Sequence, residues 1–271
     1  MDNTGKMATT TSHPKITLYW LNDSRAQRMV WLLEELGVPY DVKIFHRSKD
    51  MLAPAELTKV HPLGKSPVVT IQPSPSEPEI VLAESPFIAQ YLCDHFGGES
   101  KNLVPKKYKD GEEGKLGGET ESWMRYQHLL YYSEGSLMPP LLVALILSII
   151  SGPKIPFFIR PITSTVAGRV HNSFVVPNIE KHCSFLQQQL ETSPNGGKYL
   201  CGDTLTAADI LISYPLLNLP RVEALGGASE KGKLKEKFPK VFEYVDMLKG
   251  HEGFKRAEKK IEELEAGEKD V

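Results

Sequence analysis

The stretch HPLGKSPVVTIQPSPSEPEIVLAESPFIAQYL, residues 61–92, carries the strongest fold signal in the chain. A loop ending in Ser66-Pro67 leads into two short β runs, Val68–Ile71 and Glu79–Ala83, and Glu84-Ser85-Pro86 then opens an amphipathic helix. The proline at the strand entry indicates a rigid turn, and the sequence leaves open whether its peptide bond is cis or trans. The segment therefore predicts the order loop, hairpin, helix.

The start of this helix is suited to a small zwitterion. Ser85 is predicted as the N-cap and Pro86 as the first helical residue. The free N–H groups and the dipole of a helix N-terminus attract a carboxylate, and the neighbouring Glu84 can hold an ammonium group. Because an α-amino acid carries both charges side by side, this junction predicts a site for such a head group.

The upstream segment KITLYWLNDSRAQRMVWLLEELGVPYDVKIF, residues 15–45, is typical of strand, helix and strand. The strands are predicted at Lys15–Leu21 and Tyr40–Phe45. The helix between them is predicted from Ser24 to Leu36, with Gly37 as its C-terminal stop. Strand, helix, strand, followed by loop, hairpin and helix, is the thioredoxin-like order.

These segments together resemble the glutathione S-transferase family. SRAQR at 24–28, LLEELG at 32–37 and HPLGKSP at 61–67 are most similar to its serine-type, fungal Gtt1-type branch, and the resemblance extends over residues 15–260. It implies an α/β plus all-α protein, in which a thioredoxin-like N-terminal domain precedes an all-helical C-terminal domain. It also implies glutathione as the co-substrate.

The domain boundaries are predicted from composition and helical pattern. Residues 1–14 are a polar, disordered extension, 15–98 the glutathione-binding domain, 99–118 a charged linker, 119–265 the helical domain and 266–271 a frayed tail. Within the helical domain, Pro139-Pro140 and Pro177 are predicted to bend helices that otherwise follow the helical period, the later one over Thr165–Leu190. Thr206 and Asp209 form a capping-box pattern, to which we assign a structural role.

Thiol activation is the chemistry that the resemblance requires. A free thiol has a pKa of about 8.5, and the thiolate is the nucleophile. The resemblance makes Ser24 the hydroxyl donor to the glutathione sulfur and Arg25 a supporting cation. Without the resemblance, Ser24 could equally be a plain helix cap; with it, a catalytic hydroxyl that also caps the helix is favoured, and Tyr19 and Asn22 remain rival donors. The loop contains no cysteine, which disfavours a protein mixed disulfide.

The resemblance also assigns the two ends of glutathione. Glu84 would take the γ-glutamyl ammonium group and Ser85 the adjacent carboxylate. The backbone of Ser66, fixed by Pro67, would pair with the cysteinyl backbone. The glycine carboxylate is assigned to the basic residues nearby, Lys65, His46 and Arg47.

A second substrate, an apolar electrophile, is expected in a cleft against the helical domain. The candidate wall residues are Tyr126, His128 and Tyr132. Aromatic residues at helical spacing more often belong to a core, so this assignment competes with a purely structural one.

Composition narrows the remaining alternatives. The net charge of −2 with scattered Lys and Arg argues against nucleic-acid binding. The 3 Cys lie far apart, which suits a reducing compartment and suggests neither disulfides nor a zinc site, and the 8 His show no metal-ligand spacing. Residues 1–14 lack a secretory signal, so we expect a cytoplasmic protein. The apolar run Leu137–Ile150 is too short to span a bilayer and is predicted as a buried helix. Together with Pro153–Pro161, it leaves open a peripheral contact with an internal membrane.

The expected function is a homodimeric glutathione transferase in detoxification or stress response. Its reaction is thiolate attack on a hydrophobic electrophile, with organic peroxide reduction as a further expected activity. Two alternatives stay open: a glutathione- or ligand-binding module without turnover, and a biosynthetic transferase dedicated to one metabolite.

Overall fold

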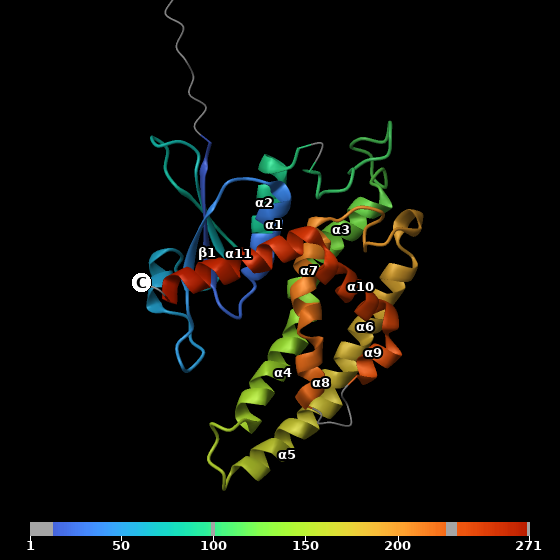
Figure 1. Cartoon of the computed structure of the whole chain (residues 1–271). Helices are drawn as coiled ribbons and strands as arrows, with labels where there is room; N and C mark the ends of the chain where they lie inside the picture. The colour runs from blue at the N-terminus through green and yellow to red at the C-terminus, as the bar shows by residue number, and fades with distance from the viewer. Residues whose placement is uncertain (1–12, 99–100, 226–231, 270–271) are drawn as a thin grey trace, which may run out of the picture.

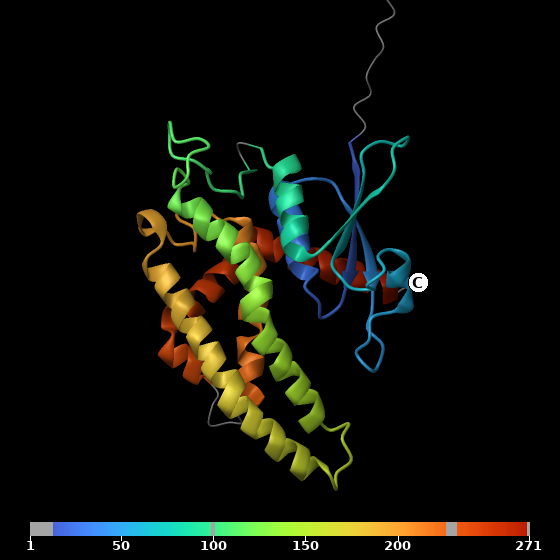
Figure 2. The same ribbon diagram turned by 180° about the vertical axis from the view of Figure 1, so that it is seen from behind.

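The computed structural model describes residues 13–98, 101–225 and 232–269, and it has two parts that share one core (Figure 1). A small sheet with helices on one face forms the first part, and a bundle of helices forms the second (Figure 2). The fold class predicted from the sequence is confirmed. The predicted disordered extension falls outside the described residues except for its last two positions, and positions 99–100 and 270–271 also lie outside them.

The sheet has the strand order β2-β1-β3-β4. β1 (Lys15–Leu21) runs parallel to β2 (Asp41–Phe45) and antiparallel to β3 (Val68–Gln72), which pairs in turn with antiparallel β4 (Ile80–Ala83). Because side chains alternate between the faces of a strand, Trp20 of β1 joins the main core and Tyr19 the smaller cluster. The strand bounds agree with the sequence prediction to within one residue.

In the first part of the molecule, two helices pack in the main core, and one short helix contributes to the smaller cluster. α1 (Gln27–Leu36) and α2 (Ser85–Phe96) bury their apolar residues in the main core, whereas η1 (Ala55–Lys59) places Leu57 in the smaller cluster. The predicted start of α1 at Ser24 was wrong, because Ser24 lies in a turn before the helix. The predicted stop is confirmed, since Gly37 ends α1 with a φ of 61°, a conformation that favours glycine.

The helical part contains helices of very different lengths. They are α3 (Glu121–Tyr132), η3 (Ser133–Leu137), α4 (Met138–Ser151), α5 (Arg160–Val170), η4 (His171–Val175), α6 (Val176–Glu191), η5 (Pro194–Gly196), α7 (Ala207–Leu217), α8 (Leu219–Leu225), α9 (Lys233–Lys237), α10 (Pro239–Gly250) and α11 (Glu252–Lys269). α11 leaves the bundle and packs along α1 (Figure 1). It continues to Lys269 and so includes most of the predicted frayed tail.

The prolines predicted to bend helices are accommodated by π-helical turns. η3 immediately precedes Pro139-Pro140, and η4 immediately precedes Pro177. A proline has no N–H for the carbonyl one turn earlier, and a π-turn shifts the hydrogen-bond pattern at that point. The helix predicted over Thr165–Leu190 is therefore continuous in direction but divided into α5, η4 and α6, and it begins earlier, at Arg160.

The prediction of a buried helix at Leu137–Ile150 was wrong for one face of α4. Pro140, Leu141, Ala144 and Leu147 are buried, but Leu142, Leu145, Ile146 and Ile149 are about half-exposed. The reason is that α4 and α5 form a hairpin that extends from the bundle (Figures 1 and 2), so neighbouring helices cover only one side of α4.

The capping box of α7 is confirmed. The Asp209 carboxylate accepts hydrogen bonds from the backbone N–H of Thr206 at 2.8 Å and from the Thr206 hydroxyl at 2.7 Å. It also accepts from the Leu200 N–H at 3.1 Å and from the Tyr244 hydroxyl at 2.6 Å. Asp209 is completely buried and joins α7, α10 and the preceding loop, which agrees with the structural role assigned to it.

Candidate functional site

The candidate site is formed where three chain segments meet at the carboxyl end of β1. The turn between β1 and α1 carries Ser24, the loop before β3 carries Ser66, and the start of α2 carries Glu84 and Ser85. The Ser24 and Ser66 hydroxyl oxygens lie 3.5 Å apart. The peptide bond between Ser66 and Pro67 is cis, which answers the question that the sequence left open.

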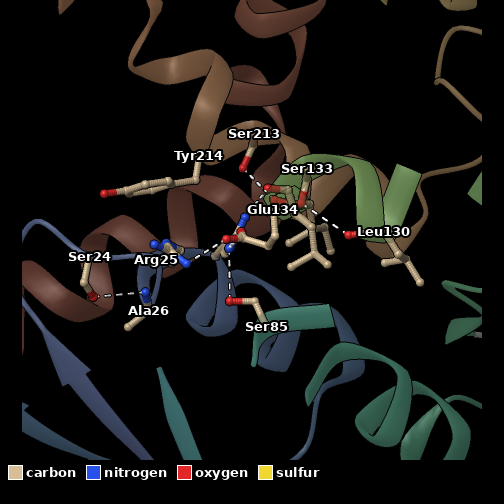
Figure 3. Close-up of polar contacts among 12 residues, drawn as sticks. Ser24, Arg25, Ala26, Ser85, Leu130, Ser133, Glu134, Ser213 and Tyr214 are labelled. Atoms are coloured by element: carbon tan, nitrogen blue, oxygen red, sulfur yellow. Dashed lines mark hydrogen bonds and ion pairs between the residues drawn. The ribbon is translucent and has the colours of Figure 1, made fainter. Parts of the chain in front are cut away.

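The hydroxyl proton of Ser24 is held only weakly. Ser24 Oγ accepts the backbone N–H of Ala26 at 3.1 Å (Figure 3). The Ser66 hydroxyl donates to the carbonyl of Tyr19 at 2.8 Å, so its own proton is committed. Ser24 must therefore be the donor in the 3.5 Å contact between the two hydroxyls, and an oxygen pair at that distance is a weak hydrogen bond. Its O–H can turn to a better acceptor, such as a sulfur anion.

The two rival donors have other contacts. Tyr19 is buried in the smaller cluster, where its ring stacks on Phe45 at 6.3 Å between centroids, with Lys43 Nζ 5.2 Å from the Tyr19 centroid. The Asn22 side-chain nitrogen donates to the Asp23 carboxylate at 3.4 Å, and its oxygen accepts the backbone N–H of Arg47 at 2.7 Å. The geometry therefore favours Ser24.

The residue directly before α2 has an unusual backbone conformation. Glu84, rather than the predicted Ser85, is the N-cap, with φ 69° and ψ 116°, and its side chain is exposed. Ser85 is the first helical residue, and Pro86 follows it. A non-glycine residue at such a φ costs on the order of 1–3 kcal/mol, and such outliers cluster at functional sites. The backbone conformation places an exposed carboxylate next to the helix N-terminus.

Sequence reasoning missed a buried arginine that links this helix start to the helical domain. The Arg28 guanidinium donates to Ser85 Oγ at 3.0 Å, to the carbonyl of Leu211 at 2.6 Å and to the Glu134 carboxylate. Arg25 donates to the other Glu134 oxygen at 2.7 Å (Figure 3). Glu134 lies in η3, so one carboxylate of the second domain holds both arginines of the first.

Burial and pairing act in opposite directions on Arg28. Burial lowers the pKa of Arg28, and the adjacent Glu134 carboxylate opposes that shift. An arginine stays protonated in proteins, so the structure keeps a full positive charge beside Ser85. The Arg28 Nε atom has no hydrogen-bond partner among the described residues.

Further arginines surround the same region. Arg28 lies 5.7 Å from the centroid of the Tyr214 ring, and Arg221 is 3.8 Å from Asp23. Burial raises the pKa of Tyr214, while Arg28, Arg25, Arg221 and Arg47 act to lower it. Four arginines thus lie around the turn after β1, where Glu134 pairs with two of them and Asp23 with one, and the surplus of positive charge favours an anion.

The sequence does contain a signal for Glu134. It is the single charged residue between Arg125 and Lys154, a long apolar stretch. A carboxylate in such surroundings is rarely left without a cationic partner. Arg28 gives a weaker signal, because it lies beside apolar positions of α1 but not in a recognisable motif.

The remaining predicted glutathione ligands lie at the edge of the site. Lys65 and His46 are exposed. Arg47 instead braces the turn after β1, donating to the carbonyls of Asn22 at 3.1 Å, Met51 at 3.0 Å and Asp23 at 3.5 Å. Their roles toward the glycine carboxylate stay predictions.

The predicted wall for a second substrate is not gathered at this site. Tyr126 is 1% exposed and belongs to the core, so it is not available to a ligand. The Tyr132 hydroxyl lies 2.7 Å from His182 Nδ1, and Tyr132 and His128 both contact Phe185 of α6. The side of α3 that contacts α2 carries Gln127 and Tyr131 instead, through Gln90. In the part of the chain that the structure describes, no cluster of His, Cys, Asp or Glu could hold a metal ion.

Comparison with known proteins places both parts in one family. A family model described as glutathione S-transferase, N-terminal domain, matches residues 24–95, and one described as glutathione S-transferase, C-terminal domain, matches residues 156–260. The chain is 34% identical over 205 residues to glutathione S-transferase 1 of Saccharomyces cerevisiae, covering 76% of this chain and 81% of that protein.

Solved structures show the same architecture. A glutathione S-transferase from Actinobacillus pleuropneumoniae aligns with a TM-score of 0.57 and 26% identity, over 90% of this chain and 92% of that one. The glutathione transferase URE2P8 of Phanerochaete chrysosporium, solved with oxidized glutathione, aligns with a TM-score of 0.65 and 16% identity, over 94% and 99% of the two chains. The second likeness supports the fold alone.

Proposed function

The chain belongs to the glutathione S-transferase family, and we propose that it binds glutathione and transfers it to apolar electrophiles. The observation that carries this proposal is the weakly held hydroxyl proton of Ser24 next to a helix start that suits an α-amino acid head group. The Ser24 hydroxyl would activate the glutathione sulfur, and the start of α2 would hold the γ-glutamyl head group.

In this mechanism the Ser24 hydroxyl donates a hydrogen bond to the glutathione sulfur and favours the thiolate. The thiol proton passes to solvent. The thiolate then attacks an electrophilic carbon, so that a carbon–sulfur bond forms and the leaving group departs with its electron pair. Arg25 and Arg28 supply positive charge nearby, which favours the anion by electrostatic attraction.

The head group of glutathione would bind at the start of α2. Glu84 pairs with the ammonium group, and the α2 N–H groups and the Ser85 hydroxyl take the carboxylate. Arg28 adds a cation within 3.0 Å of that hydroxyl. The Ser66 backbone pairs with the cysteinyl residue, and Lys65 and His46, both exposed, are the basic residues proposed to bind the glycine carboxylate.

For the second substrate, we propose the half-exposed apolar stripe of α4 rather than the aromatic residues of α3. Glu134 contacts the first domain just before α4, and Lys154 contacts the carbonyl of Lys49 at 2.6 Å just after it. α4 therefore runs between two contacts with the first domain. Leu142, Ile146 and Ile149 are exposed enough on α4 to contact an apolar molecule.

The protein is further proposed to act in the cytoplasm, in detoxification or stress response, as a homodimer. Support for a second copy comes from apolar side chains exposed on α2, α3 and the edge strand β4, namely Phe87, Met124, Tyr131 and Val81. Sedimentation equilibrium tests this, and a monomer at all concentrations would exclude the dimer.

Calorimetric titration with glutathione, followed by an assay with 1-chloro-2,4-dinitrobenzene, tests the main proposal. Saturable glutathione binding and conjugate formation are expected. A parallel assay with cumene hydroperoxide decides whether peroxide reduction accompanies conjugation. Binding without turnover of either compound would favour a binding module, and the absence of glutathione binding would remove the proposal.

A further inference from the structure

The end of the α4–α5 hairpin, residues 152–169, exposes a cluster of apolar side chains, which we term the hairpin tip. Phe157 is 81%, Phe158 70% and Ile162 65% exposed, and Val166 is about half-exposed. The two phenylalanine rings meet edge to face with 5.7 Å between centroids. The hairpin tip projects from the helix bundle (Figures 1 and 2), and it contacts the first part through Lys154, which lies against Lys49 and Asp50 in the loop after β2. Apolar groups gathered on a surface in this way mark an interaction site.

The charges of the hairpin tip are all of one sign. The sequence has no Asp or Glu between Glu134 and Glu180, and this interval contains Lys154, Arg160 and Arg169. Arg160 donates to the carbonyls of Pro153 and Ile155 and so holds the loop in shape. Arg169 is exposed, and the Lys154 side chain is 67% exposed while 3.7 Å from Asp50. The chain as a whole has a net charge of −2, so the positive charge of the hairpin tip is not a property of the overall composition.

We propose that the hairpin tip docks on an anionic lipid bilayer, with Phe157, Phe158 and Ile162 entering the boundary between headgroups and acyl chains. Apolar and aromatic side chains beside basic ones are the composition of surfaces that bind in this interface. Arg169, the exposed arginine of the hairpin tip, would reach a lipid phosphate while its aliphatic stem stays near the apolar layer. This inference does not depend on the catalytic proposal.

Two other ways of covering the hairpin tip are less consistent with its charge and packing. A second copy related by a two-fold axis would bring the same cations together, with no carboxylate from this interval to pair them. The second alternative is that α4 and the helix before it cross the bilayer. Within the described residues one helix, Glu121–Ser151, is long and apolar enough to cross a membrane. However, its α3 part packs on α7 and its η3 segment carries the ion pairs of Glu134 with Arg25 and Arg28. A surface contact keeps these interactions.

Vesicle co-sedimentation of the full chain tests the proposal. Vesicles of phosphatidylcholine alone are compared with vesicles that also contain phosphatidylserine, at low and high salt. We expect binding to the mixed vesicles, weakened by salt because screening acts on exposed charges. The double variant Phe157→Ser, Phe158→Ser is expected to reduce the partition coefficient at least about tenfold. Arg169→Glu is expected to reduce it roughly tenfold.

Matched controls come from the loop before α3, which lies at the opposite end of the molecule from the hairpin tip (Figure 1). Leu116→Ser removes a fully exposed apolar side chain, and Lys115→Glu reverses an exposed charge. Both should bind vesicles like the unmodified chain, and all variants should keep the circular dichroism spectrum. The proposal is overturned by absent binding, by equal binding to neutral vesicles, or by binding that the hairpin-tip variants leave unchanged. Loss of a dimer in the double variant, without vesicle binding by any form, would assign the hairpin tip to a second copy instead.

Discussion

Glu84 combines a strained backbone with an exposed carboxylate, and the two properties can be separated by experiment. In Glu84→Gly the strain is relieved, because glycine adopts positive φ freely, while the charge is removed. We predict an unfolding free energy that is unchanged or higher. We also predict glutathione binding weaker by about 1.5–3 kcal/mol, the range for a charge-assisted hydrogen bond.

Chemical denaturation and calorimetric titration measure the two quantities for Glu84→Gly. Glu77→Gly, in the exposed turn between β3 and β4, is the matched control and should leave glutathione affinity unchanged. A Glu84→Gly variant with full affinity would contradict the assignment of the ammonium group to this carboxylate.

Glu134 is predicted to hold the start of α2 in its binding geometry through Arg28. Glu134→Gln keeps the side-chain shape but leaves the buried guanidinium without its charged partner. Breaking such a pair costs about 3–5 kcal/mol of stability, and we expect glutathione affinity to fall as Ser85 loses its fixed donor. Glu121→Gln, which removes an exposed partner of Arg125, should cost about 1 kcal/mol or less. Equal stability of the two variants in urea would refute this role.

Site residues that form local motifs were easier to predict from the sequence than residues that make long-range contacts. Glu84 and Ser85 were recognisable because a helix start is a short motif with its own chemistry, whereas the role of Ser24 was inferred from the family resemblance. Arg28 and Glu134 were not recognisable, since they are 106 positions apart and meet only when the two parts pack. Tyr126 was misjudged because helical spacing alone does not distinguish a core face from a ligand-facing one.

The capping box of α7 is the clearest case of an element fixed by its own sequence. Burial raises the pKa of Asp209, while hydrogen bonds from Tyr244 and Thr206 oppose that shift. In Asp209→Asn an amide nitrogen would face donors, so we predict a loss of about 3 kcal/mol in unfolding free energy. Turnover per folded molecule should not change. Asp203→Asn, an exposed neighbour, is the control, and a thermal melt of Asp209→Asn that matched it would contradict this account.

The sequence predicted where the proline-associated helix irregularities lie but not that they are π-helical turns. Pro139, Pro140 and Pro177 marked where backbone N–H groups are missing. Whether a helix then breaks, kinks or takes a π-turn depends on packing around it. The half-exposed face of α4 was missed for a related reason. Its apolar residues extend all around the helix, and such a pattern ordinarily indicates full burial.

The two parts of the molecule share one continuous core, which the predicted domain division did not suggest. The main cluster runs from Ile16 of β1 through α1 and α7 to Ile261 of α11. Trp31 of α1 contacts Phe254 of α11 edge to face at 5.3 Å between centroids. Sequence patterns identify what each element buries, but not which distant element covers it.

Because of this shared core, we predict that both parts unfold together in a single cooperative transition. The expected result is that near-ultraviolet and far-ultraviolet circular dichroism give the same midpoint in urea. Saturating glutathione should move both midpoints upward by the same amount, since a ligand that binds only the folded state stabilises it. Two separated transitions would show that the parts fold independently.

The central claim is that Ser24 activates the glutathione thiol, and an ultraviolet titration of bound glutathione thiolate against pH tests it most directly. Unmodified protein and Ser24→Ala are compared at saturating glutathione. The ordinary pKa of a thiol is about 8.5. In the unmodified protein we predict that the bound thiolate forms well below that pH. In Ser24→Ala the midpoint should shift upward while glutathione still binds. Identical midpoints in the two proteins would contradict the claim and transfer the donor role to Tyr19 or Asn22.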